Sequence, residues 1–245
     1  MRISLAFESN ESINLPISYN HMLQSLIFKI VSKKLPGFHD DGPCLNNRQF
    51  RPFVFSRIKG KHVIHNNQIK FEPPISFSVA SPYDEIIQVI GNQFLKSEKL
   101  DIIGRKLKLV RIEVCDQKVK EFPVKVITLS PITIRSTLIT PEGKRKSYYY
   151  NPFEKDFEAQ IKANLLRKAK AIGLELLSNE FSIKPIGKMK QRIIKYKGFI
   201  IIAWDGRFEV LGNTELIKLA FNWGLGSKNA QGFGMIKILK GGEQS

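Results

Sequence analysis

The predicted secondary-structure elements occur in the same order twice along this 245-residue chain. In the first half, an alternating strand at Arg2 to Phe7 precedes a helix at Tyr19 to Lys34, whose apolar residues recur at helical spacing. Two strands, a helix that begins after Ser81 and a closing strand at Lys106 to Val114 follow. This order is that of a βαββαβ unit, in which helices cover one face of a single sheet.

The second half shows the same order. A long strand is predicted at Lys125 to Thr137, and a basic hairpin leads to a helix at Pro152 to Leu177 that has Asn151 as its N-cap. Four short strands, a short helix after Asn213 and a last strand at Met235 to Leu239 complete the chain. The repetition is one of pattern, because no residue-level repeat is visible.

We therefore predict an α+β fold of two tandem ferredoxin-like (βαββαβ, RRM-like) domains, at residues 1–120 and 121–245. The chain carries 39 Lys and Arg against 22 Asp and Glu, a net charge of +17. Both predicted domains are basic, at +7 and +10, so the charge does not belong to a detachable tail. Folded surfaces of this charge favour a polyanionic partner such as a nucleic acid.

Other classes of protein fit the sequence less well. No apolar run reaches 18 residues and the first residues lack an apolar signal core, so we expect a cytoplasmic protein without a membrane partner. Cys44 and Cys115 lack metal-site spacing and are interpreted as two reduced thiols. The sequence leaves dimerisation open.

A glycine-rich stretch, "GLGSKNAQGFGMI", occupies Gly224 to Ile236. A helix-like run precedes it and a strand follows it, which is the reverse of a nucleotide-binding P-loop, so mononucleotide binding is not expected. The glycines would let the backbone approach a phosphodiester closely, or they would form a tight helix-to-strand connection with Gly224 as C-cap. The candidate RNA-binding residues here are Gly224, Gly226, Lys228, Asn229, Gly232 and Gly234.

Two further basic strips are candidates for RNA contact, because cations beside aromatic rings suit backbone contact and base stacking. The first lies in the predicted hairpin and precedes three tyrosines at 148–150. The second opens a basic strand. An ordinary solvated hairpin and strand face explain the same residues about equally well. The two strips consist of Lys144, Arg145 and Lys146, and of Lys188, Lys190 and Arg192.

The glycine-rich stretch before a C-terminal strand resembles the glycine-rich loop of the RAMP superfamily of CRISPR RNA-binding proteins. The stretches "LPISYNHMLQSLIFKIV", "FRPFVFSRIKG" and "VKVITLSPITIRS" resemble the Cas-six family of CRISPR repeat-RNA endoribonucleases, in the family's order. The resemblance implies two ferredoxin-like domains, binding of CRISPR repeat RNA, and metal-independent cleavage of the precursor transcript into guide units. It implies no cofactor.

Cleavage of RNA without a metal ion requires deprotonation of a 2′-hydroxyl, protonation of the leaving 5′-oxygen and neutralisation of the pentacoordinate state. An imidazole and fixed cations suit these tasks, and the products are a 2′,3′-cyclic phosphate and a 5′-hydroxyl. His39, in "PGFHDDG", stands where the resembled family carries its catalytic histidine. His21, His62 and His65 are interpreted as structural or surface residues.

The resemblance also implies a tyrosine on the first helix and a lysine before the second strand. Phe28 and Arg51 stand at these positions, and Phe28 has no proton to give. Arg51 would hold a phosphate but donates protons poorly, since its pKa exceeds about 12. Lys29 is the third catalytic candidate, with Tyr19 and Arg48 as alternatives.

Two readings without catalysis stay open. The first is a RAMP subunit that binds guide RNA inside a CRISPR interference complex, which the phenylalanine at position 28 favours. The second is a general single-strand RNA-binding protein, which would bind repeat and scrambled RNA equally. A metal site is not expected, because adjacent residues such as His39, Asp40 and Asp41 seldom converge on one ion.

Overall fold

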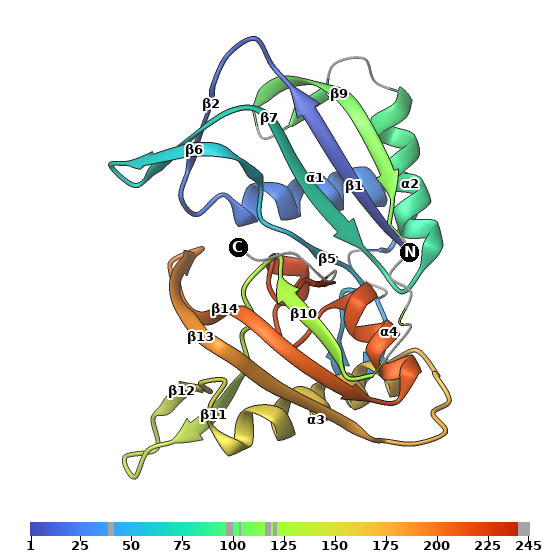
Figure 1. Ribbon diagram of the computed structural model, residues 1–245, viewed down its shortest axis with the longest axis vertical. Helices are drawn as coiled ribbons and strands as arrows, with labels where there is room; N and C mark the ends of the chain where they lie inside the picture. The colour runs from blue at the N-terminus through green and yellow to red at the C-terminus, as the bar shows by residue number, and fades with distance from the viewer. Residues whose placement is uncertain (39–41, 97–99, 103, 116–118, 120–121, 240–245) are drawn as a thin grey trace.

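The computed structural model describes residues 1–38, 42–96, 100–102, 104–115, 119 and 122–239. Two mixed α/β units lie one above the other, and the C-terminal part of the chain passes between them (Figure 1). Each unit contains one antiparallel sheet with two helices. No described helix has the length and apolar character that a membrane crossing requires.

The first unit has the sheet order β2-β7-β1-β9-β8, and β5 and β6 also pair with β7. Helices α1 and α2 contact each other, and Figure 1 shows them beside this sheet. The central order β9-β1-β7 with β5 and β6 beyond it is that of a ferredoxin-like domain. The elements are β1 (Arg2–Glu8), β2 (Ile13–Pro16), α1 (Asn20–Ser32), β5 (Val54–Phe55), β6 (Lys59–His65), β7 (Gln68–Ala80), α2 (Asp84–Lys96), β8 (Leu100–Ile102) and β9 (Arg105–Val114).

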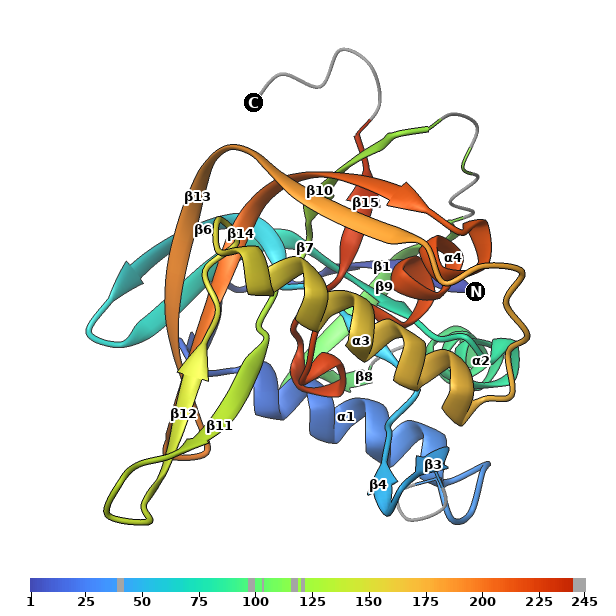
Figure 2. The same ribbon diagram turned by 90° about the horizontal axis from the view of Figure 1, so that it is seen from below.

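The second unit has the sheet order β13-β14-β10-β15, with α3 and α4 packed together. Two small two-stranded sheets stand apart from the main ones: β3–β4, and the hairpin of β11 and β12 that projects from the body in Figure 2. The elements are β3 (Cys44–Leu45), β4 (Arg48–Gln49), β10 (Val124–Thr128), β11 (Arg135–Ile139), β12 (Arg145–Tyr149), α3 (Lys155–Ala171), β13 (Phe181–Tyr196), β14 (Phe199–Gly212), α4 (Thr214–Trp223), a 3-10 turn η1 (Asn229–Gln231) and β15 (Ile236–Ile238).

The predicted α+β fold of two ferredoxin-like units is confirmed, with two corrections to its strands. The predicted long strand at 125–137 divides at Ser130 and Pro131 into β10 and β11, because the chain leaves one sheet for the hairpin. The four short strands predicted after α3 are two long ones, β13 and β14. They pair throughout, with a register shift between Ile186 and Lys190.

The start of α3 differs from its prediction, although the predicted capping residues interact. The Asn151 side chain accepts from the Phe153 N–H at 3.0 Å, and Glu154 accepts from the Asn151 N–H at 3.2 Å. These bonds close a turn over 152–154, and α3 begins only at Lys155 and ends at Ala171. The predicted start of α4 after Asn213 is confirmed, and Asn213 is its N-cap, because its side chain accepts from two amides of the first turn.

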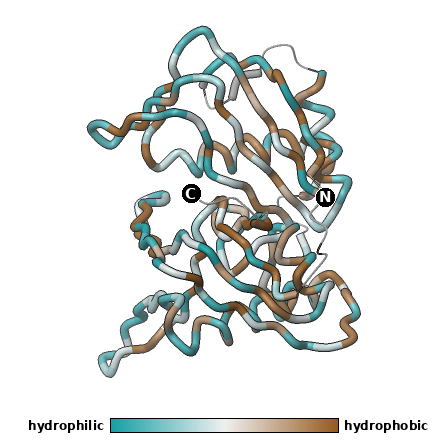
Figure 3. Tube along the Cα trace, viewed as in Figure 1, coloured by the Kyte–Doolittle hydropathy of each residue, from teal (hydrophilic) through white to brown (hydrophobic). Residues whose placement is uncertain are grey.

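The two units pack closely through residues that each contributes to the other. Phe50, from the first half of the sequence, lies in the core of the second unit, and its ring meets Trp223 edge-on at 5.9 Å. Ala230, near the C-terminus, lies in the core of the first unit. In Figure 3 hydrophobic and hydrophilic residues alternate along the strands, as expected where one sheet face is buried. The predicted boundary at 120/121 lies outside the described residues and stays a prediction.

Candidate active site at the glycine loop

The glycine loop, Gly224–Gly234, lies between the two units, where the 3-10 turn sits between α1 and α3 (Figure 2). All four of its glycines have a positive φ, between 70° and 84°, which disfavours any residue with a Cβ. A Cβ at Gly234 would lie 2.0 Å from the Leu225 oxygen, and one at Gly226 would lie 2.4 Å from the Thr133 oxygen. The packing of the loop itself therefore requires these glycines.

This geometry bears on both interpretations of the sequence. Gly224 is the C-cap of α4, and the loop is a tight helix-to-strand connection, which agrees with the structural interpretation of the glycines. The space that a Cβ would take at each glycine is occupied by other parts of the protein, for example the Phe55 ring at Gly232. Direct phosphate contact by the backbone of Gly224, Gly226, Gly232 and Gly234 stays a prediction.

Two buried polar side chains hold the loop from inside. The Asn229 amide donates to the carbonyls of Leu225 and Phe233 at 3.1 and 3.0 Å. Lys168 on α3 is only 2% exposed, and its Nζ donates to the Gly224 carbonyl at 2.8 Å. The sequence reasoning missed Lys168. Its position on the apolar stripe of α3, three residues after Leu165, is the signal that would have found it.

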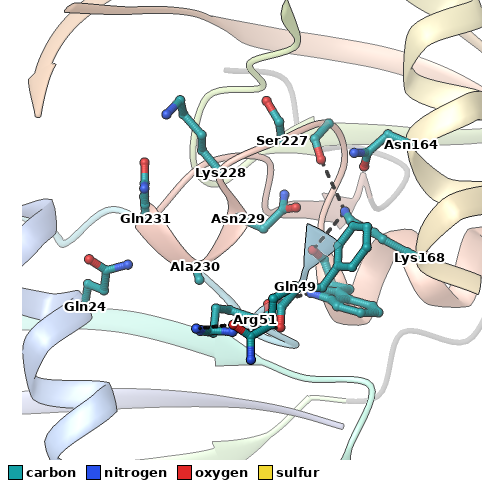
Figure 4. Close-up of a pocket in the computed structure, with 13 residues that line it drawn as sticks. Gln24, Gln49, Arg51, Asn164, Lys168, Ser227, Lys228, Asn229, Ala230 and Gln231 are labelled. Atoms are coloured by element: carbon teal, nitrogen blue, oxygen red, sulfur yellow. Dashed lines mark hydrogen bonds between the residues drawn. The ribbon is translucent and has the colours of Figure 1, made fainter. Parts of the chain in front are cut away.

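A pocket of about 210 Å³ opens beside the loop and is called the loop pocket here (Figure 4). It brings together Arg51 and Lys228, two predicted site residues that are far apart in the sequence. Such a pocket combines cationic side chains with a rigid backbone, which suits a phosphodiester. Its lining includes Gln24, Gln49, Arg51, Asn164, Lys228 and Gln231.

Arg51 is held in place at this pocket by its neighbours. Its Nη2 donates to the Gln49 side chain at 3.0 Å, and its carbonyl accepts from the Trp223 indole at 2.7 Å. Gly42 packs against the same segment, since a Cβ there would lie 2.2 Å from the Phe50 oxygen and 3.1 Å from Arg51 Nη1. Gly42, three residues after His39 in sequence, therefore lies against Arg51.

His39 itself lies outside the described residues, and so do Asp40 and Asp41. Phe38, the residue before it, packs its ring 5.8 Å from Phe28 and 6.0 Å from Phe53. Phe28 also meets Phe53 edge-on at 5.3 Å. The phenylalanine that stands where the resemblance implies a tyrosine thus belongs to an aromatic cluster with Phe38 and Phe53.

The other proposed proton-transfer residues lie away from the pocket or outside the described set. Lys29 is exposed on the last turn of α1 and does not line the loop pocket, so its catalytic role stays a prediction. Tyr19 is buried, its hydroxyl accepts from the Ile58 N–H at 3.1 Å, and burial raises its pKa. It is a core residue. Nothing is described of the Arg48 side chain.

Lys228 is half-buried at the rim of the loop pocket, and its backbone is left-handed with φ of 61°. Burial lowers the pKa of its amine, and the nearby charge of Arg135 lowers it further. Both causes penalise the charged amine, and an anion bound beside it would reverse that penalty. Lys228 is therefore suited to a phosphate ligand.

A second cavity of about 320 Å³, called the interdomain groove, lies between β6 and the N-terminal end of α1 on one side and β13 on the other. Its basic residues come from both units, and Arg192 is one of the predicted RNA contacts. Ile64 and Ile193 give it an apolar wall, and both are more than half exposed. The basic lining consists of Arg57, His62, Arg192 and Lys195.

The remaining predicted RNA contacts lie on open surfaces. Lys144, Arg145 and Lys146 are exposed on the β11–β12 hairpin, and Lys188 and Lys190 are exposed on β13. The tyrosine hydroxyls beside the hairpin donate to protein groups, for example Tyr149 to the Ile200 carbonyl at 3.1 Å. RNA contact by these lysines and by Arg145 stays a prediction.

The described part of the chain holds no group of three or more His, Cys, Asp or Glu side chains placed to bind a metal ion. His21 and His62 are each occupied locally, since their Nδ1 atoms lie 2.8 and 2.9 Å from the carbonyls of Ser18 and Gly60. Both fit the predicted structural or surface role. His65 is exposed on β6.

Two ferredoxin-like units enclose a C-terminal glycine loop and a basic pocket, and solved structures share this fold. The solved structure titled "An RAMP protein binding different RNA substrates" has this fold, with a TM-score of 0.81 at 23% identity over 98% of this chain and 100% of that one. A structure from a Cas6-related gene of Pyrococcus furiosus reaches 0.84 at 26% identity, over 100% and 99% of the two chains.

Sequence comparison narrows the class to one family. Residues 115–238 match the family described as "CRISPR associated protein Cas6, C-terminal", which is half of the chain. Curated relatives named CRISPR-associated endoribonuclease Cas6 occur in Methanocaldococcus jannaschii, at 27% identity over 96% of this chain and 92% of the relative, and in Pyrococcus furiosus, at 26% over 94% and 86%. The chain belongs to the Cas6 (Cas-six) family of CRISPR-associated endoribonucleases.

Proposed function

We propose that this protein binds CRISPR repeat RNA at the loop pocket and cleaves it without a metal ion, leaving a 2′,3′-cyclic phosphate and a 5′-hydroxyl. Family membership supports repeat RNA as the substrate. The two units, residues 1–120 and 121–245, each contribute one side of the site. Association with other CRISPR subunits and dimerisation stay predictions.

One observation carries the proposal. Arg51 from the first half of the chain and Lys228 from the second line the same pocket, and Gly42, three residues after His39, packs against Arg51. His39 is three residues before Gly42 in the sequence, which supports the proposal that the histidine acts at this site. A base and two cations near one site are what RNA transesterification needs.

In the proposed reaction, the His39 imidazole removes the proton from the ribose 2′-hydroxyl. The 2′-oxygen then forms a bond to phosphorus while the bond from phosphorus to the 5′-oxygen breaks. Arg51 and Lys228 stabilise the negative charge that builds up on the non-bridging oxygens. Arg51 stays protonated, so the 5′-oxygen takes its proton from solvent or from the imidazolium that the first step produced.

The test is cleavage of end-labelled repeat RNA in EDTA by the wild-type protein and by His39→Ala. We expect wild-type cleavage at one position and a loss of at least about 100-fold in the variant, since general base catalysis contributes about 10²–10⁴-fold. A 2′-deoxy substitution at the mapped nucleotide should stop cleavage. Full activity of His39→Ala, or abolition of wild-type cleavage by EDTA alone, would contradict the mechanism.

A second candidate is a Cas6-family protein that binds repeat RNA without cutting it. The packing of Phe28 against Phe38 and Phe53 favours it, because the position that the resemblance assigns to a catalytic tyrosine is used for structure. Tight, repeat-selective binding with no scission over hours would establish this reading. Equal affinity for repeat RNA and a scrambled RNA would contradict both candidate functions.

A further inference from the structure

Two buried amide oxygens at the loop pocket accept no hydrogen bond from any described residue. They are Oδ1 of Asn164 on α3 and Oε1 of Gln231 at the end of the 3-10 turn. Both side chains line the pocket. In folded proteins the large majority of buried side-chain polar atoms have a hydrogen-bond partner, so two unpartnered acceptors at one cavity indicate a ligand that donates to them.

Asn164 is the more constrained of the two. It is only 2% exposed, and Figure 4 shows its amide directed from α3 toward the glycine loop. Lys168, one turn later on the same helix, faces the same loop and donates to the Gly224 carbonyl. The two side chains of α3 therefore have different roles. Lys168 donates to the backbone of the glycine loop, and Asn164 Oδ1 remains available to accept a hydrogen bond from a ligand in the loop pocket.

The other groups at the pocket limit what the ligand can be. Arg51 and Lys228 supply cations, which suit a phosphate, while Asn164 and Gln231 supply acceptors, which suit an N–H or O–H donor. A nucleotide of the proposed RNA substrate carries both a phosphate and such a donor within one unit. The volume of about 210 Å³ lies below the range of about 300–1,000 Å³ that holds drug-sized ligands, so one nucleotide is favoured over a longer segment.

We propose that the loop pocket holds one nucleotide of the repeat RNA and that Asn164 Oδ1 and Gln231 Oε1 accept hydrogen bonds from its base or its ribose hydroxyl. This inference rests on the proposed function. It makes Asn164 and Gln231 specificity-determining residues: a nucleotide without the matching donor leaves a buried acceptor unpaired and binds more weakly. A penalty of about tenfold at one repeat position is expected.

The experiment measures binding, so it does not depend on cleavage. Where a cleavage site is mapped, the bridging 5′-oxygen of the repeat RNA is replaced there by a methylene group, which prevents cleavage and keeps every 2′-hydroxyl. A panel then removes one donor at a time. One arm replaces bases by analogues without the donor, such as purine for adenine, inosine for guanine, 2-pyrimidinone for cytosine and N3-methyluracil for uracil. The other arm replaces single riboses by 2′-deoxyriboses.

Wild-type protein should show a position where removal of the donor weakens binding about tenfold, and Asn164→Ala should lose that penalty while keeping the penalties at other positions. Asn164→Asp, which keeps acceptor oxygens, should retain it. Gln88→Ala, which removes an exposed amide on α2, is the matched control and should behave as wild type. If the penalty that Asn164→Ala loses belongs to a base analogue, the donor is on the base. If it belongs to a 2′-deoxyribose, the donor is the ribose hydroxyl.

The proposal is overturned if Asn164→Ala keeps every positional penalty, or if it weakens binding to all members of the panel by the same factor. If Asn164→Ala does not fold, Gln231→Ala on the loop takes its place under the same two criteria. Failure of the proposed function looks different. It would appear as an absence of cleavage, whereas this panel measures binding only. A protein that does not cleave repeat RNA therefore still gives a result for or against the roles of Asn164 and Gln231.

Discussion

Arg57 of the first unit forms an ion pair with Asp205 of the second, with 3.1 Å between Nη1 and Oδ2. The same carboxylate oxygen lies 2.7 Å from Nε of Arg192, so one acidic group serves two guanidinium groups. All three are partly exposed, and such pairs contribute little to stability, at most about 1 kcal/mol each. These ion pairs instead position the side chains. Asp205 holds Arg57 and Arg192 at the interdomain groove, and one carboxylate beside two guanidinium groups leaves the groove with a net positive charge.

Arg192→Ala should therefore weaken binding of repeat RNA rather than unfold the protein. If Arg192 contacts one phosphate, the slope of log Kobs against log salt should become shallower by about 0.7, the value for a single strand. The loss should be similar for every base sequence. Lys218→Ala removes an exposed cation that pairs with Glu215 on α4 and is the control. An unchanged slope would show that Arg192 pairs with Asp205 and does not contact an RNA phosphate.

Arg51→Ala should reduce the rate of cleavage by about 100-fold at saturating RNA, because removal of one group that stabilises an oxyanion costs about 10²–10³ in rate. Arg51→Lys should recover part of the rate, since it restores the charge without the planar fork. Single-turnover kinetics separate this effect from binding. Arg111→Ala, on exposed β9, is the control. A normal rate in Arg51→Ala would exclude Arg51 from the site.

The sequence predicted the parts of the site that are local in the chain. The glycine stretch, its place between a helix and a strand, and the cation at Lys228 are all visible in one short segment. The order of strands and helices also followed from periodicity, because each element buries one face. The division of the strand at Pro131 was missed, since the move to a separate hairpin depends on packing between elements.

The long-range parts of the site were not predictable from local patterns. Asn164 and Lys168 were interpreted only as part of a helix, and their buried faces became visible when α3 was placed against the loop. Arg51 and Lys228 were both proposed, but nothing in their spacing indicated that they share a pocket. Contacts across so many residues arise from the docking of the two units, which leaves no periodic signal in the sequence.

Phe28→Tyr tests whether the missing tyrosine limits catalysis. The ring packs against Phe38 and Phe53, so we expect the added hydroxyl to change the single-turnover rate by less than about threefold. Phe28→Ala should instead lower the free energy of unfolding by about 2–4 kcal/mol, because it removes a partly buried aromatic ring that packs against the core. A large gain in rate with Phe28→Tyr would show that the hydroxyl reaches the reacting atoms.

Gly234→Ala should destabilise the protein strongly. Its φ is 83° and its Cβ would lie 2.0 Å from the Leu225 oxygen, so the loop must move. Gly143→Ala is a matched control, because Gly143 has a φ of 74° on the basic hairpin and nothing within 4 Å of its Cβ position. We expect about 1 kcal/mol for the control and more than about 2 kcal/mol for Gly234→Ala in denaturant unfolding. Equal losses would show that the loop tolerates the Cβ.

The lowered pKa of Lys228 makes binding sensitive to alkaline pH. Burial disfavours the charged amine, so in the free protein Lys228 loses its proton at a lower pH than the ordinary 10.5. Affinity for an uncleavable repeat RNA should therefore fall as the pH rises from 7 toward 10.5, sooner than the titration of ordinary exposed lysines predicts. Lys228→Arg, which stays charged throughout, should remove that early fall. Superimposable pH profiles of the two proteins would show that the Lys228 amine does not contact the phosphate.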